Sequence, residues 1–171
     1  MSLIVEKLPK IKYQKGFTLL ELLVTIALLG VIAAVILRAI NPFTQIAKAR
    51  DAVRKQDVNA LARAIQAYHV ENYPALPAAG NTYISTDGSP PENAGGAGWI
   101  PSDLSTQVKT LPIDLLNNGA YFYRYYADTV PPPGRFKIDV RMEADFAAAE
   151  NDGGIDPNRY EVGTDKTLLP P

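Results

Sequence analysis

The chain has 171 residues with 17 basic side chains, 18 acidic side chains and no cysteine, which gives a formal net charge of −1. This composition excludes disulfide bonds and thiolate metal sites, and it does not favour nucleic-acid binding, because phosphate contacts need clustered Lys and Arg. Residues 1–16 contain four lysines and one glutamate, whereas the rest of the chain is acidic. A basic leader, an apolar run and an acidic body are typical of a chain that crosses a membrane once, with the leader in the cytoplasm.

The first predicted element is a helix over residues 17–40, after a leader that occupies residues 1–16. Its apolar core, Phe17 to Leu37, has 21 residues. At 1.5 Å per residue a helix of this length spans roughly 30 Å, the hydrocarbon thickness of a bilayer. The apolar region of a secretory signal peptide is shorter, about 7–15 residues. The run therefore predicts a membrane anchor, and Glu21 stands out in it because a carboxylate at membrane depth is costly.

After Asn41-Pro42 the apolar period changes to that of an amphipathic helix, predicted over residues 41–73. Pro74 pushes Tyr73 out of helical dihedral angles, so this helix should end near Asn72. The residues expected on its covered, apolar face are Ile46, Ala49, Val53, Ala60, Leu61, Ala64, Ile65 and Tyr68. The charged residues expected mainly on the opposite face are Lys48, Arg50, Asp51, Arg54, Lys55, Asp57 and Arg63.

The remainder, residues 74–171, is rich in Gly and Pro and is predicted to form a globular, β-rich domain. The predicted strands cover residues 120–127, 135–142 and 159–163, and the alternation over 135–142 indicates a half-buried strand. Residues 78–98 are expected to form a long surface loop, and residues 102–109 one or two helical turns with Ser102 as the N-cap. The predicted fold class is α+β, with a long N-terminal helix packed against a small antiparallel sheet of about three strands.

The stretch KGFTLLELLVTIALLG, from Lys15 to Gly30, resembles the class III signal sequence of type IV prepilins and type II secretion pseudopilins. The pattern of that family is a short basic leader that ends in Gly, then Phe-Thr, then Glu at the fifth mature position and a long apolar run. Gly16, Phe17, Thr18 and Glu21 match each element in turn. Weaker similarities follow over residues 68–74 and 111–126.

The resemblance implies that a prepilin peptidase cuts between Gly16 and Phe17 and methylates the new amine of Phe17. A cut at this place leaves the apolar anchor on the mature chain. The resemblance also implies that Glu21 pairs with the N-terminal amine of a neighbouring subunit as a filament grows. Gly30 and Pro42 mark a segment that partly unwinds in filaments of this kind, although each is also explained as a simple kink or a tolerated helix breaker.

The leading functional hypothesis is a structural subunit of a type IV pilus-like filament that polymerises through its N-terminal helix. One alternative is a pseudopilin of a type II secretion system, and a second is a single-pass anchored domain that does not polymerise. The partners implied are further copies in a homo-oligomeric helical filament, the prepilin peptidase and an inner-membrane assembly platform. The subunit would lie in the cytoplasmic membrane before assembly and in an extracellular or periplasmic filament afterwards.

Neither an enzyme nor a resident cofactor is expected. The chain has a single histidine, His69, and no Ser-His-Asp set, reactive cysteine or phosphate-binding loop. Major pseudopilins often hold a calcium ion in their C-terminal loop, and hard cations take several oxygen ligands. The candidate ligands here are Asp152, Asp156 and Asp165, with a solvated turn as the alternative, because the chain lacks the Asp-rich ending of that family.

Overall fold

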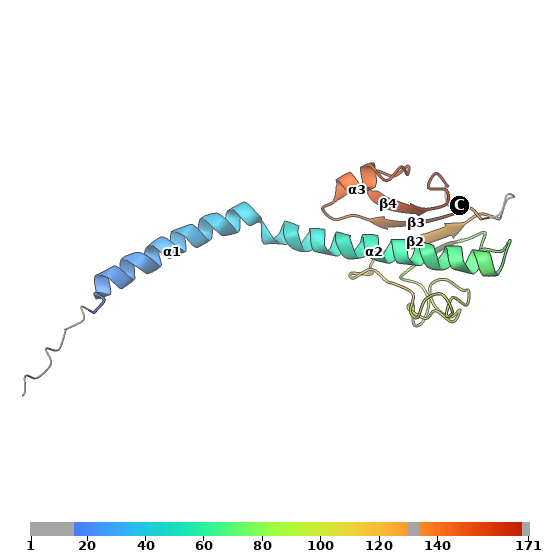
Figure 1. The fold of residues 1–171 in the computed structure, drawn as a ribbon, viewed down its shortest axis with the longest axis horizontal. Helices are drawn as coiled ribbons and strands as arrows, with labels where there is room; N and C mark the ends of the chain where they lie inside the picture. Colours follow the sequence, from blue (N-terminus) through green and yellow to red (C-terminus); the bar gives the residue numbers. More distant parts are fainter. Residues whose placement is uncertain (1–15, 130–133, 169–171) are drawn as a thin grey trace, which may run out of the picture. The chain divides into compact units, whose positions relative to one another are not determined.

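The computed structural model describes residues 16–129 and 134–168, so the predicted leader, apart from Gly16, lies outside the described residues. The chain divides into two compact units, Met1–Pro42 and Phe43–Pro171. Figure 1 shows the helices and strands of both units in chain order. The second unit is called the globular unit below.

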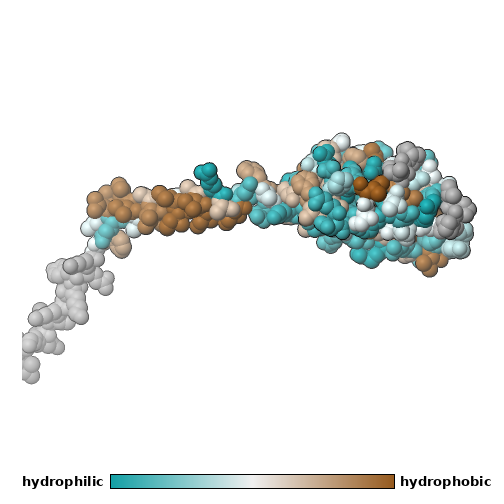
Figure 2. Space-filling view, turned by 90° about the horizontal axis from the view of Figure 1, so that it is seen from above, coloured by the Kyte–Doolittle hydropathy of each residue, from teal (hydrophilic) through white to brown (hydrophobic). Residues whose placement is uncertain are grey.

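The first unit contains helix α1, Leu19–Ile40, which has no buried residue. Thr18 caps its N-terminus, and Asn41 ends it in the left-handed conformation, with φ of 45°. Figure 2 shows the side chains of this helix as an almost continuous hydrophobic surface. Within the described residues, one helical stretch is long and apolar enough to cross a membrane, and it includes α1.

Helix α2, Pro42–Glu71, begins with a proline in its first turn, where the missing N–H would have no intrahelical partner. It ends at Glu71, one residue before Asn72, the end predicted from the position of Pro74. Its buried apolar residues, which pack into the core of the globular unit, are Val58, Leu61, Ala62, Ala64 and Ile65.

The sheet is antiparallel with the strand order β1-β2-β3-β4, and its strands are β1 (Thr82–Ile84), β2 (Tyr123–Ala127), β3 (Phe136–Arg141) and β4 (Arg159–Gly163). Figure 1 shows strands β2–β4 beside α2. Tyr123, Tyr125, Ile138 and Val140 are fully buried in the core that α2 also enters. The predicted α+β fold, a long helix packed against a small antiparallel sheet, is confirmed, with four strands instead of about three.

Two local predictions need correction, and one helix was not predicted. The supposed surface loop 78–98 contains β1, which pairs with Arg124–Tyr126 at the edge of the sheet; three residues are too few to show an alternating pattern. Residues 102–109 form no helix, since Ser102 Oγ accepts a hydrogen bond from the Ala78 N–H (2.9 Å) instead of capping one. A short helix, α3 (Phe146–Glu150), follows β3 and was not predicted.

The largest correction concerns the two faces of α2. Asp51 and Arg54, predicted on the outer face, are 0% exposed, whereas Ile46 and Val53, predicted to be covered, are 52% and 39% exposed. Of the later positions predicted on the covered face, Leu61, Ala64 and Ile65 are buried, whereas Ala60 is exposed. In the first half of α2 the charges of Asp51 and Arg54 therefore face inward, because their ionic partners lie there.

β3 also differs from the predicted half-buried strand. Its residues Phe136 to Val140 are all buried, including Lys137 and Asp139 on the face turned away from the apolar core. Ion pairs with neighbouring strands make this possible, since a buried charge must be paired. Asp139 bonds Arg124 and Arg159, and Lys137 bonds Glu161.

Candidate assembly site

The N-terminal segment brings three predicted site residues, Gly16, Phe17 and Glu21, to the start of α1. Thr18 and Glu21 form a reciprocal capping box. The Thr18 backbone N–H and hydroxyl both donate to Glu21 Oε2, each over 3.0 Å, and the Glu21 N–H donates to Thr18 Oγ1 over 3.2 Å. The first two bonds hold the carboxylate in the first helical turn, where the helix dipole also favours a negative charge.

Thr18 is a residue of this site to which the sequence interpretation assigned no role. The signal was present, since Thr-x-x-Glu before an apolar run is the sequence pattern of a capping box. The box uses only atoms of Thr18 and Glu21, so it does not depend on the residues before Phe17. A cut between Gly16 and Phe17 would leave it intact.

Gly30 and Pro42, the two residues linked with flexibility, lie in different settings. Gly30 is in the middle of α1, and a Cβ added there would meet nothing within 4 Å outside the helix's own backbone. Neither a positive φ nor crowding within the described chain therefore demands glycine at this position. Pro42 follows the left-handed Asn41 and opens α2, so it stands at a helix boundary. Their proposed role in helix unwinding stays a prediction.

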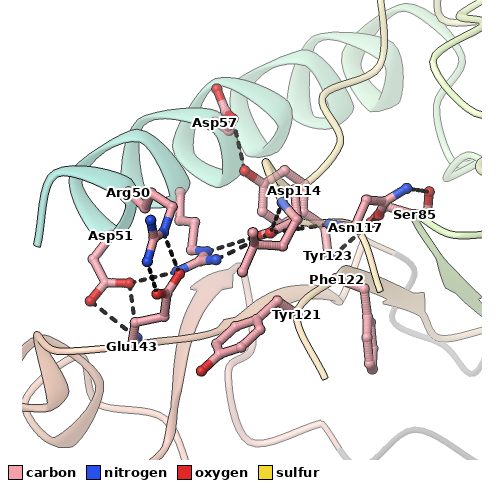
Figure 3. Close-up of polar contacts among 12 residues, drawn as sticks. Arg50, Asp51, Asp57, Ser85, Asp114, Asn117, Tyr121, Phe122, Tyr123 and Glu143 are labelled. Atoms are coloured by element: carbon pink, nitrogen blue, oxygen red, sulfur yellow. Dashed lines mark hydrogen bonds and ion pairs between the residues drawn. The ribbon is translucent and has the colours of Figure 1, made fainter. Parts of the chain in front are cut away.

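A buried ionic cluster fastens the first half of α2 to the rest of the globular unit (Figure 3). Its centre is the Arg54 guanidinium, which donates to both oxygens of Asp114, from Nε over 2.5 Å and from Nη2 over 3.1 Å. Arg54 Nη1 bonds Asp51 Oδ1 (2.9 Å) and lies 2.5 Å from Glu143 Oε1. Because Asp114 precedes β2 and Glu143 follows β3, one side chain ties α2 to both segments.

Asp51 and Arg50 extend this cluster along α2. The Asp51 carboxylate accepts the backbone N–H groups of Glu143, Ala144 and Asp145, over 2.7–3.1 Å. Arg50 donates to both oxygens of Glu143, a bidentate pair that gives geometric specificity. Side chains of α2 therefore bind the turn after β3 both at its backbone N–H groups and at the Glu143 carboxylate.

The aromatic residues that precede and begin β2 complete the cluster. The Arg54 guanidinium lies 4.8 Å from the centre of the Tyr121 ring, a cation–π contact. The Tyr123 hydroxyl donates to Asp57 Oδ2 over 2.8 Å. Burial raises the pKa of Tyr123, and the Asp57 carboxylate raises it further. The tyrosines Tyr123 and Tyr125 are both fully buried and thus serve core packing.

Two carboxylates of the turn after β3 have a lowered pKa. The hydrogen bonds from Arg50 and then Arg54 lower the pKa of Glu143, against the opposing effect of burial, and the bond from Lys55 lowers the pKa of Asp145. A carboxylate with a lowered pKa stabilises the fold fully above its unfolded pKa, about 4, and loses this contribution as the pH falls through the folded value.

We therefore expect acid to destabilise the globular unit through these two groups. The melting temperature, followed by circular dichroism in detergent, should fall as the pH is lowered from about 5 to 2. The variant Glu143→Gln should melt lower than the wild type at neutral pH and lose less on acidification, because one of the two titrating groups is gone. Parallel pH curves for the two proteins would contradict this assignment.

The predicted calcium ligands Asp152, Asp156 and Asp165 do not converge on a common point. Among residues 16–129 and 134–168, no three His, Cys, Asp or Glu side chains form a group able to hold a metal ion. Asp156 Oδ1 accepts the Asn158 N–H (2.9 Å), and Asp165 Oδ1 accepts the Thr167 N–H (3.0 Å), so both stabilise local turns. Asp152 accepts the N–H groups of Gly154 and Glu161.

Two lysines bond to residues in and next to the acidic loop 152–156. Lys137 Nζ bonds Glu161 Oε1 (2.8 Å), and Lys166 Nζ bonds the main-chain oxygen of Asp152. Glu161 Oε2 in turn accepts the N–H groups of Ile155 and Asp156. The loop 152–156 is thus closed over β4 by side chains of the chain itself.

Comparison with known proteins relates the N-terminal segment to a described motif. The family description "Prokaryotic N-terminal methylation motif" matches residues 11–37. Type II secretion system core protein G of Pseudomonas aeruginosa is 28% identical over 122 residues, which cover 71% of this chain and 80% of that protein. No solved structure matches the chain significantly.

Proposed function

Because the chain belongs to the type IV pilin and pseudopilin family, we propose that it is a structural filament subunit, not an enzyme, that polymerises through α1. The observation that carries this proposal is the helix itself. None of its 22 residues is buried, and nearly all of them are apolar. Such a surface is not stable in water, so it needs lipid before assembly and other helices afterwards.

The proposed assembly step joins Glu21 to the amine of Phe17 on a neighbouring subunit, after a prepilin peptidase has cut at Gly16 and methylated that amine. The capping box supports this role, because it fixes the carboxylate through Oε2 at the start of the helix. Oppositely charged groups attract strongly in a medium of low dielectric constant. Pairing would also remove the cost of two separate charges in an apolar environment.

We place the subunit in the cytoplasmic membrane before assembly and in a periplasmic filament afterwards, with an inner-membrane platform as the assembly partner. Of the two machines that use such filaments, a secretion pseudopilus is favoured, because the relative that covers 71% of this chain is named as a type II secretion core protein. A type IV pilus is the second candidate. The basic leader and acidic body support the orientation in both cases.

The test is co-expression with a prepilin peptidase, followed by intact mass and sedimentation of detergent-free filaments. The wild type should yield a product that begins at methylated Phe17 and pellets. Glu21→Gln should be cut at the same bond but should not pellet, because glutamine keeps the oxygen that Thr18 bonds and loses the charge that the amine needs.

Thr25→Val is the matched control, since it also changes a polar residue of α1, whose hydroxyl bonds only the Leu22 main-chain oxygen among the described contacts (2.8 Å). It should be processed and should pellet like the wild type. A wild-type chain that keeps residues 1–16 or is cut after Leu37 would overturn the proposal. A chain that is processed but never pellets would support the anchored domain that does not polymerise.

A further inference from the structure

The loop that leads into β2 contains the only Asn-Gly pair of the sequence, Asn118-Gly119. Both residues are exposed to solvent. A Cβ added at Gly119 would meet nothing within 4 Å, so the described chain leaves open space around this residue. An asparagine side chain and the peptide nitrogen that follows it can close into a succinimide ring, and glycine hinders this closure least because it has no side chain.

The two groups that such a ring closure uses are both free at this pair. Among the residues that the structure describes, neither the Gly119 N–H nor the Asn118 Nδ2 amide group has a hydrogen-bond partner. The nitrogen of Gly119 is the nucleophile, and Nδ2 is the leaving group. A group that makes a hydrogen bond must give it up before it reacts, and a free group does not have this cost.

The side-chain oxygen of Asn118, in contrast, is held by two donors. Asn118 Oδ1 accepts the backbone N–H groups of Ala120 and Tyr121, each over 3.0 Å. When a nitrogen adds to the side-chain carbon Cγ, negative charge develops on this oxygen. Backbone N–H groups aimed at such an oxygen stabilise the charge, as in an oxyanion hole. The turn therefore polarises the carbonyl group that is attacked.

The neighbouring Asn117 lacks this freedom and is an internal reference (Figure 3). Its Oδ1 accepts the Ser85 hydroxyl (2.7 Å), and its Nδ2 donates to the Ser85 main-chain oxygen (2.9 Å). The nitrogen that would attack it, that of Asn118, donates to the Tyr121 main-chain oxygen over 2.9 Å. Of these two adjacent asparagines, only Asn118 has both reacting groups free.

We propose that Asn118-Gly119 is a site of spontaneous deamidation in the folded protein. The Gly119 nitrogen gives its proton to base and bonds to Asn118 Cγ, while the bond from Cγ to Nδ2 breaks and Nδ2 leaves as ammonia with a proton from the solvent. Water then opens the succinimide at either carbonyl, which yields aspartate or isoaspartate at position 118. The steps together consume one water and release one ammonia, and nothing is oxidised or reduced. The reaction needs only the folded globular unit, so this inference does not rest on the proposed function.

The products change the loop that supports the ionic cluster. This loop runs from Asp114, which bonds Arg54, to Tyr121, whose ring lies 4.8 Å from the same guanidinium. Both products add a negative charge, but isoaspartate also adds a carbon atom to the main chain between these two contacts. The isoaspartate form should therefore melt at a lower temperature than the variant Asn118→Asp, which carries the charge on an unchanged main chain.

The first test follows the reaction in the folded full chain. The wild type is incubated in detergent at mildly basic pH, digested and analysed by mass spectrometry, which detects the replacement of the amide NH2 by OH. An isoaspartyl methyltransferase with a labelled methyl donor then reports the isoaspartate. Asn118 should be modified at least about tenfold faster than Asn117, a difference of about 1.4 kcal/mol in activation free energy.

Gly119→Ala is the matched variant for this test. Gly119 has open space around it and no left-handed φ, so alanine fits the fold. Its methyl group hinders the attacking nitrogen and should slow the reaction at position 118 at least about tenfold, with the melting temperature unchanged. An unchanged rate of modification in this variant would overturn the inference.

Incubation of the same chain unfolded in urea supplies the decisive comparison. Modification at position 118 in urea but not in the folded protein would show that the fold protects the pair, and would overturn the inference. Equal rates at positions 117 and 118 in the folded protein would do the same. A wild type that never pellets would overturn the proposed function and leave this inference standing, because the reaction needs no filament.

Discussion

Replacing Arg54 by leucine should destabilise the globular unit by about 3–5 kcal/mol, the cost typical of breaking a buried ion pair by removing one partner. The Arg54 side chain is 0% exposed and bonds Asp51, Asp114 and Glu143. Without the guanidinium, these carboxylates would face one another with little water to screen them. A loss of this size should lower the melting temperature by about 10 °C or more, measured by circular dichroism on the full chain in detergent.

Arg63→Leu is the matched control, since it removes an arginine from an exposed position of the same helix. Surface substitutions usually change stability by no more than about 0.5 kcal/mol. Arg54→Leu combined with Asp114→Leu should lose less than the sum of the two single losses, because the second change removes a charge that the first left unpaired. Equal effects at positions 54 and 63 would show that the cluster contributes nothing to stability.

Replacing Lys137 by methionine should cost about 3 kcal/mol, again by leaving a buried charge without its partner. The Glu161 side chain is 0% exposed, and Lys137 Nζ lies 2.8 Å from its Oε1. The N–H groups of Ile155 and Asp156 would still bond Oε2, so part of the stabilisation of the charge remains. The measurement is the free energy of unfolding in urea, with Lys109→Met, at an exposed lysine, as the control.

Thermal melting of the wild type with added calcium or with a chelator decides the calcium prediction. We expect neither to change the wild-type melting temperature, because Lys137 and Lys166 already supply positive charge around the loop 152–156. A ligand that binds the folded state must raise its stability. A calcium-dependent increase, lost in Asp152→Asn, would therefore contradict this expectation and establish the predicted site.

The N-terminal region was accessible to sequence reasoning because its determinants are local. A run of apolar residues forms a helix that needs no other part of the chain, and the residues from Gly16 to Glu21 have fixed spacing along it. The capping box of Thr18 and Glu21, to which no role was assigned from the sequence, also joins residues only three positions apart. The strand over residues 159–163 was found with its exact bounds for a similar reason, since its end is marked by a glycine.

The error in α2 has the opposite origin. The spacing of Ile46, Ala49 and Val53 is that of one helical face, but periodicity identifies a face and not whether that face is buried. Which side of α2 is buried is determined by Asp114 and Glu143, which lie 60 and 89 residues after Arg54 along the chain. The three meet only in the folded chain.

The sequence by itself therefore determined the membrane helix, the motif at its start, the class of the fold and three of its strands. Only the tertiary structure decided which side of α2 is buried, that β3 is buried on both faces and that the acidic loop is closed by lysines. The physical reason is that a charge can be buried only where opposite charges arrive to pair with it. In this chain those partners come from segments that are distant in sequence, and folding alone brings them together.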